Sequence, residues 1–254
     1  MVPNIFHFCF GLAPDFGGKS FSLVHYLAIK SAHAVNNPDK IFFYYSYEPQ
    51  GEWWEKSKQL IELIKVNPPE EIFGNKLHHV AHKADVLRLE KLIEYGGIYL
   101  DLDTICKKSF KPLLNNKFVI GKQGKWRRMG LCNAVMMAEK NSEFAKVWLE
   151  SYKTFRSKGK DKYWSEHSVE IPLKLSKNYK NILHIENYNS FHFPLYYPSS
   201  LKNLFVYNKN YPEAFCHHLW EGGSWEKYLR DLSLEDILKR DSTYNIIARR
   251  FLND

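Results

Sequence analysis

Long hydrophobic runs and targeting signals are absent from this sequence. No stretch of the 254 residues approaches the roughly 20 consecutive apolar residues of a membrane-spanning helix. The apolar segment VPNIFHFCFG at residues 2–11 has no basic leader and no small-residue cleavage site, so it is predicted to be a first strand. We therefore expect a cytoplasmic protein without a membrane anchor.

Cysteine is scarce, and neither an internal repeat nor a low-complexity tract is found. The chain has four cysteines without CxxC spacing. They are Cys9, Cys106, Cys132 and Cys216. This pattern excludes a disulfide scaffold and indicates reduced thiols. With 44% hydrophobic residues, the chain can bury a sizeable core as one domain.

The formal net charge is +8, from 36 basic and 28 acidic residues. Basic chains bind nucleic acids or membrane surfaces, but enzymes that act on diphosphates also need positive potential. The charge is densest in GKQGKWRRMG (121–130) and FRSKGKDK (155–162). Both are interpreted either as solvated loops or as surfaces facing an acceptor, an anionic glycan or a membrane. No nucleic-acid-binding motif is present, so a nucleic-acid partner is not expected.

The richest segment is HKADVLRLEKLIEYGGIYLDLD at residues 82–103. Val86, Leu89 and Ile93 have helical spacing, which predicts a largely buried helix. Asp85 and Arg88 lie three residues apart and therefore share one edge of that helix. They are either a plain ion pair or part of a binding site.

Two glycines, Gly96 and Gly97, predict the end of this helix, because glycine adopts left-handed conformations readily. The period then changes to two, as in a strand. Ile98, Leu100 and Leu102 are predicted on one face, and Tyr99, Asp101 and Asp103 on the other. Paired carboxylates at the end of a buried strand are costly without a cation. Mg²⁺ or Mn²⁺ is the expected ligand, because both prefer oxygen donors.

The remaining pattern alternates strands and helices, which predicts an α/β sheet with ligands bound beyond the strand carboxyl ends. Strands are predicted at about 4–10, 41–47, 118–121 and 131–138. Helices are predicted at about 20–36, 52–66, 142–155, 233–240 and 242–252. Residues 184–216 are predicted to form short strands and turns.

The 82–103 segment resembles the core motif of the DXD-type glycosyltransferases of family 32. This family includes bacterial capsular and fungal initiating α-1,6-mannosyl transferases; clostridial toxin glucosyltransferases and α-1,4-galactosyltransferases are more distant relatives. The opening strand at 2–11 and HHLWEGGSW at 217–225 resemble two further family elements, in the family's order. The matching core positions are Lys83, Asp85, Arg88, Tyr95, Gly96, Gly97, Ile98, Tyr99, Asp101 and Asp103.

The resemblance implies a GT-A fold, a Rossmann-like mixed sheet flanked by helices, in a single catalytic domain over 1–254. Residues 1–140 would bind the nucleotide sugar, and 141–254 would form the acceptor side with C-terminal helices. It also implies transfer from a UDP- or GDP-sugar to a glycan hydroxyl, with retention of configuration and with the assistance of Mn²⁺ or Mg²⁺.

By resemblance, Asp101, Asp103 and His218 would hold the metal, with His217 as a competitor of His218. Asp101, Asp103 and Arg88 would be the catalytic residues. Phe10 stands where the family usually has a tryptophan near the base. The implied donor-binding set is Phe10, Lys83, Asp85, Arg88, Gly97, Asp101, Asn133, Trp220, Ser224 and Trp225. The alternative for both tryptophans is an ordinary core position.

The largest departure from the family lies at YWSEHSVEIPLKL (163–175), where a Thr-Gly-Pro element is usual. Glu166 and His167 there are interpreted either as acceptor-binding residues or as an ordinary surface turn. The acceptor, the donor sugar and the oligomeric state are left open by the sequence.

Other functions compete with the transferase. A haloacid-dehalogenase-type phosphatase also carries Asp-x-Asp after a strand, but it requires Thr or Val four residues after the first aspartate. Ile105 holds that position here, and Thr104 comes one residue too early. A non-catalytic carbohydrate- or nucleotide-binding protein is the other alternative.

Overall fold

A mixed seven-stranded sheet forms the centre of the computed structural model, which describes residues 1–126 and 129–252. The strand order is β10-β8-β9-β6-β1-β2-β3. Strand β9 runs antiparallel to both β6 and β8, and the other neighbours are parallel. The strands are β1 (Ile5–Cys9), β2 (Lys40–Tyr45), β3 (Glu62–Lys65), β6 (Gly97–Leu100), β8 (Phe118–Lys122), β9 (Leu131–Ala138) and β10 (Leu183–Glu186). The expected α/β architecture is confirmed.

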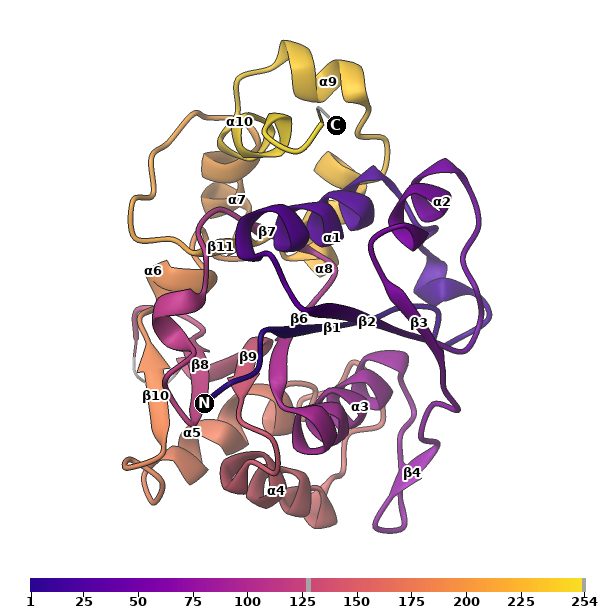
Figure 1. Cartoon of the computed structure of the whole chain (residues 1–254). Coiled ribbons are helices and arrows are strands. Elements are labelled where there is room, and N and C mark those ends of the chain that lie inside the picture. The colour runs from indigo at the N-terminus through magenta and orange to yellow at the C-terminus, as the bar shows by residue number, and fades with distance from the viewer. Residues whose placement is uncertain (127–128, 253–254) are drawn as a thin grey trace.

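Helices cover both faces of this sheet (Figure 1). One layer holds α3 (Val80–Tyr95), α4 (Glu143–Glu150) and α5 (Ile171–Ser176). The other holds α1 (Leu23–Asn36), α2 (Glu52–Lys58), α7 (Pro198–Phe205), α8 (Glu221–Ser224), α9 (Leu234–Lys239) and α10 (Thr243–Arg249). Among the described residues, no helix combines the length and apolarity that a membrane crossing requires.

Two small two-stranded sheets accompany the central sheet. Strand β7 (Thr104–Cys106) pairs antiparallel with β11 (Cys216–His218), and β4 (Glu71–Ile72) forms a hairpin with β5 (Asn75–Lys76). A short helix, α6 (Tyr188–Phe191), follows β10. Because β7 comes directly after the carboxylate pair, its pairing with β11 brings the C-terminal third of the chain to the motif.

The residues of β1 and β6 divide between the two faces of the sheet as the period of two predicts. Phe6, Phe8, Ile98 and Leu100 belong to the core cluster that also contains α1 and α10 side chains. Tyr99 faces the other cluster, which contains residues of α3 and α4. The alternating pattern therefore determines which side chains can reach the edge where β6 ends.

The two-glycine junction between α3 and β6 is confirmed. Gly96 and Gly97 have φ of 69° and 107°. A Cβ at Gly97 would lie 2.4 Å from the carbonyl oxygen of Ile5. Any larger residue would therefore push β6 away from β1, which would displace the carboxylates that follow.

Three sequence predictions were wrong in detail. The helix predicted at 52–66 ends at Lys58, because residues 62–65 pair with β2 and become the edge strand β3. The region 184–216 contains the helices α6 and α7 besides strands; Pro198 at the first turn suits a helix start. Strand β6 ends at Leu100, so both aspartates lie in the loop before β7.

In the first basic patch, Arg127 and Arg128 lie outside the described residues.

A buried histidine at the centre of the sheet should make stability depend on pH. Burial lowers the pKa of His7 to about 4, although its hydrogen bond to the carbonyl of Gly96 (2.7 Å) opposes this shift. The unfolded chain, with a pKa near 6.5, takes up a proton first as pH falls, so stability is lost between about pH 6.5 and 4. From pH 7 to 5 we expect His7 to remove about 2 kcal/mol of unfolding free energy.

Urea unfolding of wild type and His7→Gln at several pH values measures this dependence. The variant should show a shallower pH slope, although it is less stable at pH 7. The exposed His33 provides the control, because His33→Gln should keep the wild-type slope. Equal slopes for wild type and His7→Gln would contradict the assignment.

Candidate active site

The two aspartates lie in a short loop that both neighbouring chain segments hold in place. The backbone N–H of Asp101 donates to the carbonyl of Ala134 on β9 at 2.9 Å. The hydroxyl of Thr104 donates back to the carbonyl of Asp101 at 2.8 Å. The carbonyl of Asp103 accepts from the N–H of Leu219 at 2.7 Å. The loop is thus tied to the sheet and to the segment after β11.

His218 is brought to the aspartates by the β7–β11 pairing, in which it lies opposite Thr104. Its Nε2 lies 3.2 Å from Oδ2 of Asp103. Ligand atoms of Asp101, Asp103 and His218 lie within 4.8 Å of one another. His217, the alternative, points elsewhere: its Nδ1 lies 2.9 Å from the carbonyl of Phe193. The structure therefore places His218, and not His217, with the carboxylates.

The carboxylates differ in their electrostatic environment. Burial raises the pKa of Asp101 to about 6, against the opposing charge of Arg88. Burial would also raise the pKa of Asp103, but the ion pair with His218 and the N–H of Glu221 outweigh it and lower that pKa to about 2. Asp103 is therefore an anion at neutral pH, and His218 is held as its cationic partner, with a raised pKa.

A buried guanidinium supports the first carboxylate. Arg88 contacts Asp101 through Nη1 at 3.0 Å and Asp85 through Nη2 at 3.3 Å. Asn133 contacts both members of the Asp85–Arg88 pair. Its side-chain Nδ2 donates to Asp85 (2.7 Å), and its backbone carbonyl accepts from Arg88 (2.9 Å). Tyr99 donates to Asp101 at 3.0 Å. The ion pair considered from the sequence is thus part of a buried network, in which Asp85 and Asn133 position Arg88.

Arg88, Tyr99 and Asp101, together with Asp103 and His218, line a cleft of about 420 Å³. Phe10 lines it too, stacked on Phe16 with ring centroids 5.7 Å apart. Lys160, from the second basic patch, contributes a cation to the lining. The other lining residues include Lys19, His25, His79, Arg88, Tyr99, Asp101, Asp103, Trp164, His218 and Glu221.

One part of the cleft was not predicted. Oxygens of Glu221 contact Nζ of Lys19 at 2.6 Å and Nε2 of His25 at 3.0 Å. The backbone N–H of Glu221 donates to Oδ2 of Asp103 at 2.7 Å. Glu221 lies about 200 residues away from Lys19 and His25 along the chain, so no local sequence pattern predicts their contact. Only the position of Glu221 directly after the predicted His-x-Trp element pointed toward this region.

Several predicted donor-binding residues do not line the cleft and contact other parts of the protein instead. Lys83 pairs with Glu70, and Gly97 packs on β1. The hydroxyl of Ser224, fully buried, donates to the carbonyl of Leu219 at 2.7 Å. Contact of these residues with a donor stays a prediction.

The two tryptophans are also engaged by the protein itself. Trp220 donates through Nε1 to the carbonyl of Pro194 at 2.7 Å, and its ring packs on His218 with centroids 4.1 Å apart. Trp225 is buried and stacks on His25. Both tryptophans therefore pack against residues that line the cleft. This packing agrees more closely with the alternative given from the sequence, an ordinary core position, than with direct donor contact.

The predicted acceptor residues lie away from the cleft lining. Both oxygens of Glu166 accept from Arg156, at 3.0 and 2.7 Å. His167 is buried, with Nε2 3.1 Å from the carbonyl of Ser151. These contacts account for both residues structurally, and an acceptor role for them stays a prediction.

Comparison with known proteins identifies the family. The family described as "Glycosyltransferase sugar-binding region containing DXD motif" matches residues 24–119. "Glucan organizing enzyme 1" of Cryptococcus neoformans var. grubii is 34% identical over 265 residues, covering 99% of this chain and 71% of that protein.

Two solved structures share the fold at low identity. An active-site variant of LgtC is 16% identical with a TM-score of 0.52, covering 98% of this chain and 97% of that one. Mouse xyloside xylosyltransferase 1 is 10% identical with a TM-score of 0.53, covering 88% and 99%. With its mixed sheet and its carboxylate pair at the end of β6, the chain belongs to the DXD-containing glycosyltransferases of GT-A fold.

Proposed function

We propose that this glycosyltransferase moves a sugar from a UDP- or GDP-sugar to a glycan hydroxyl, with retention of configuration and with Mn²⁺ or Mg²⁺ as cofactor. The observation that carries the proposal is the convergence of Asp101, Asp103 and His218 at the wall of a cleft that also presents Lys19 and Lys160. Carboxylates suit a hard cation, and lysines suit the diphosphate that such a cation accompanies.

The residues fit a divalent cation by charge as well as by ligand type. Three carboxylates, of Asp85, Asp101 and Asp103, face two cations, Arg88 and His218, in a buried site. An excess of negative charge in a buried site is costly unless a cation compensates it. Asp101, Asp103 and His218 would hold the cation, which would supply neutralisation of charge on the departing diphosphate.

The protein's own contribution is to fix the carboxylates in advance. Arg88 and Tyr99 hold one oxygen of Asp101, while the N–H of Glu221 holds Oδ2 of Asp103. Groups fixed before the substrate arrives need no reorganisation during the reaction, which is the main source of electrostatic catalysis. Phe10, supported by Phe16, offers a ring face on which the nucleobase would stack.

Retention is implied by the family, and the acidic groups that the cleft offers bear on the route by which it would be achieved. Among the described residues that line it, the acidic ones are Asp101, Asp103 and Glu221. The first two belong to the cation cluster, and Glu221 is engaged by Lys19 and His25. A free carboxylate nucleophile is therefore not found in this lining. We infer same-face substitution, in which a phosphate oxygen of the leaving group accepts the proton of the incoming hydroxyl.

We assign donor binding to residues 1–140 and the acceptor side to 141–254. Most residues lining the cleft belong to the first part. On the second part, Tyr196 and Tyr197 are exposed by 38% and 45%, with ring centroids 4.4 Å apart. Tyr196 contacts Trp220, which packs on His218. Exposed aromatic faces suit sugar rings, so this pair supports a glycan approaching from that side.

Thermal denaturation with UDP- and GDP-sugars, each with and without Mn²⁺, tests the proposal. We expect one nucleotide to raise the melting temperature only when Mn²⁺ is present, because ligand binding to the native state adds RT ln(1 + [L]/Kd). Release of the nucleoside diphosphate with a glycan acceptor would then separate an enzyme from a binding protein. Stabilisation by glycan alone, or by nucleotide without any metal effect, would contradict the proposal.

A further inference from the structure

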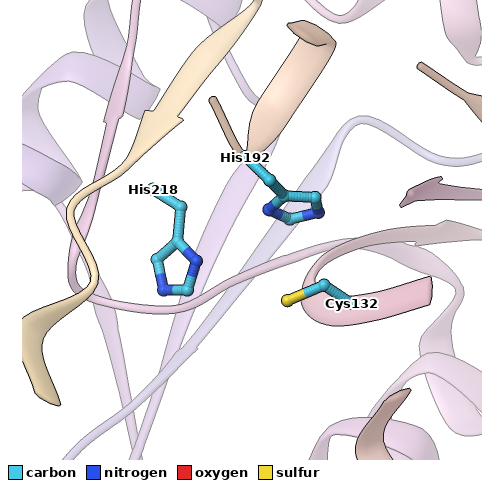
Figure 2. A group of neighbouring side chains, drawn as sticks. All are labelled: Cys132, His192 and His218. Carbon is cyan, nitrogen blue, oxygen red and sulfur yellow. The ribbon is translucent and has the colours of Figure 1, made fainter. Parts of the chain in front are cut away.

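A second group of potential metal ligands lies next to the group of Asp101, Asp103 and His218, and the two groups share His218. Cys132 of β9, His192 after α6 and His218 of β11 are all buried, and their ligand atoms lie within 4.8 Å of one another. Figure 2 shows the sulfur of Cys132 and a ring nitrogen of His192 both directed toward His218. Segments far apart in the sequence therefore converge on one point with sulfur and imidazole donors.

The imidazole of His192 has no hydrogen-bond partner. Neither of its ring nitrogens makes a hydrogen bond among residues 1–126 and 129–252, although the residue is 0% exposed. Such a group costs free energy unless something binds it. Two unpaired nitrogens on a fully buried imidazole are therefore an observation that a bound metal would explain.

Gly121 leaves room for the ring of His192 to lie in this position. A Cβ at Gly121 would approach Nε2 of His192 to 2.9 Å and its Cδ2 to 3.0 Å. This edge of the ring thus rests on the backbone of β8, and the opposite nitrogen, Nδ1, faces the cluster (Figure 2). The arrangement directs one specific lone pair at His218 and Cys132.

His218 is already oriented as a metal-binding histidine usually is. Its Nε2 lies 3.2 Å from Oδ2 of Asp103, whereas its Nδ1 has no hydrogen-bond partner of ordinary geometry in the described part of the chain. A histidine that donates one ring N–H to a carboxylate can bind a metal through its other nitrogen once that nitrogen has lost its proton, and this carboxylate–histidine–metal order recurs at zinc sites.

We propose that Cys132, His192 and His218 form a zinc site, with Asp103 as the carboxylate that orients His218. One thiolate and two imidazoles match zinc better than Mg²⁺ or Mn²⁺, which prefer oxygen. Ligand atoms in a tetrahedral zinc site lie roughly 3.6 Å apart, so shifts of about 1 Å in the side-chain atoms would bring the three ligands to zinc-binding distances. Binding displaces the thiol proton of Cys132 and one imidazole proton of His218 to solvent.

The zinc site would share one residue with the hard-cation site. Through Nδ1, His218 would bind zinc, and through Nε2 it would donate to Asp103, so zinc would prevent Nε2 from reaching the other cation. This coupling rests on the proposed function, whereas zinc binding itself does not. The structure therefore predicts that zinc leaves the hard cation with the carboxylates of Asp101 and Asp103 as its protein ligands.

Cobalt substitution provides the test, because a thiolate ligand gives Co²⁺ a near-ultraviolet charge-transfer band. The full chain, freed of metal by a chelator, is titrated with Co²⁺ and then Zn²⁺. We expect the band to saturate at roughly one ion per chain and to be displaced by zinc. Cys132→Ser should lose the band and His192→Gln should lower affinity more than about 100-fold, whereas Asp103→Asn should lower it about 10–100-fold. Cys106→Ala, at another buried free cysteine, is the matched control and should behave as wild type.

Circular dichroism establishes that each variant is folded before its titration is interpreted. A band that survives in Cys132→Ser, or wild-type protein that takes up no thiophilic ion, would overturn the zinc site. Asp101→Asn separates the two hypotheses: it should keep the cobalt band while losing the Mn²⁺-dependent stabilisation by nucleotide. Loss of Mn²⁺ dependence in the wild type, with the band intact, would refute the proposed cofactor and leave the zinc site standing.

Discussion

Replacing Asp103 by asparagine is expected to lower turnover by at least about 1,000-fold, or about 4 kcal/mol of transition-state stabilisation. The amide removes the anion that faces His218 and that would hold the cation, but it can still accept the N–H of Glu221. The loop before β7 should therefore keep its conformation while the electrostatic contribution of the site is lost. Release of nucleoside diphosphate at saturating Mn²⁺ is the measurement.

The control for Asp103→Asn is Asp231→Asn, at an exposed aspartate outside the cleft lining. It should retain wild-type turnover. Because the site is buried, the variants also need equal far-ultraviolet circular dichroism. Full turnover by Asp103→Asn under saturating Mn²⁺ would remove the carboxylate pair from the mechanism.

Replacing Arg88 by methionine should destabilise the protein by about 3–5 kcal/mol, because it leaves the buried Asp85 and the partly buried Asp101 without their cationic partner. The guanidinium is 5% exposed and also donates to the carbonyl of Asn133. For a chain of this size the loss corresponds to a fall in melting temperature of roughly 10 °C. Thermal and urea unfolding measure it.

A matched surface variant and a double variant make this prediction specific. Arg240 pairs with Asp236 on the surface with its side chain 78% exposed, and Arg240→Met should change stability by no more than about 0.5 kcal/mol. Adding Asp101→Asn to Arg88→Met should restore part of the lost stability, since one uncompensated charge is removed. A small effect of Arg88→Met, or no recovery in the double variant, would show that the network does not hold the site.

The local part of this site follows from the sequence. The spacing of Val86, Leu89 and Ile93 indicated α3, and the two glycines indicated where β6 begins. Asp101 and Asp103 were predicted to converge on one strand face; they do converge, but from a loop after the strand. Periodicity fixes which residues share a face, yet it carries no information about the residue at which backbone pairing stops.

The prediction at 52–66 failed for a similar reason. Residues 62–65 become a strand because β2 offers an unpaired edge, and that edge exists only in the folded sheet. The helices of 188–205 arise within an aromatic-rich segment whose composition favoured strands. Tertiary pairing and packing outweigh such preferences, which amount to less than about 1 kcal/mol per residue.

The sequence by itself determined the family motif, the alternation of strands and helices, and the chemical character of the carboxylate pair. Only the tertiary structure decided that His218 and not His217 meets Asp103, that Glu221 links Lys19 to the cleft, and that Cys132 and His192 converge behind it. The physical reason is distance along the chain. Local periodicity specifies neighbours within a turn or a strand, whereas contacts across about 100 residues depend on how whole elements pack.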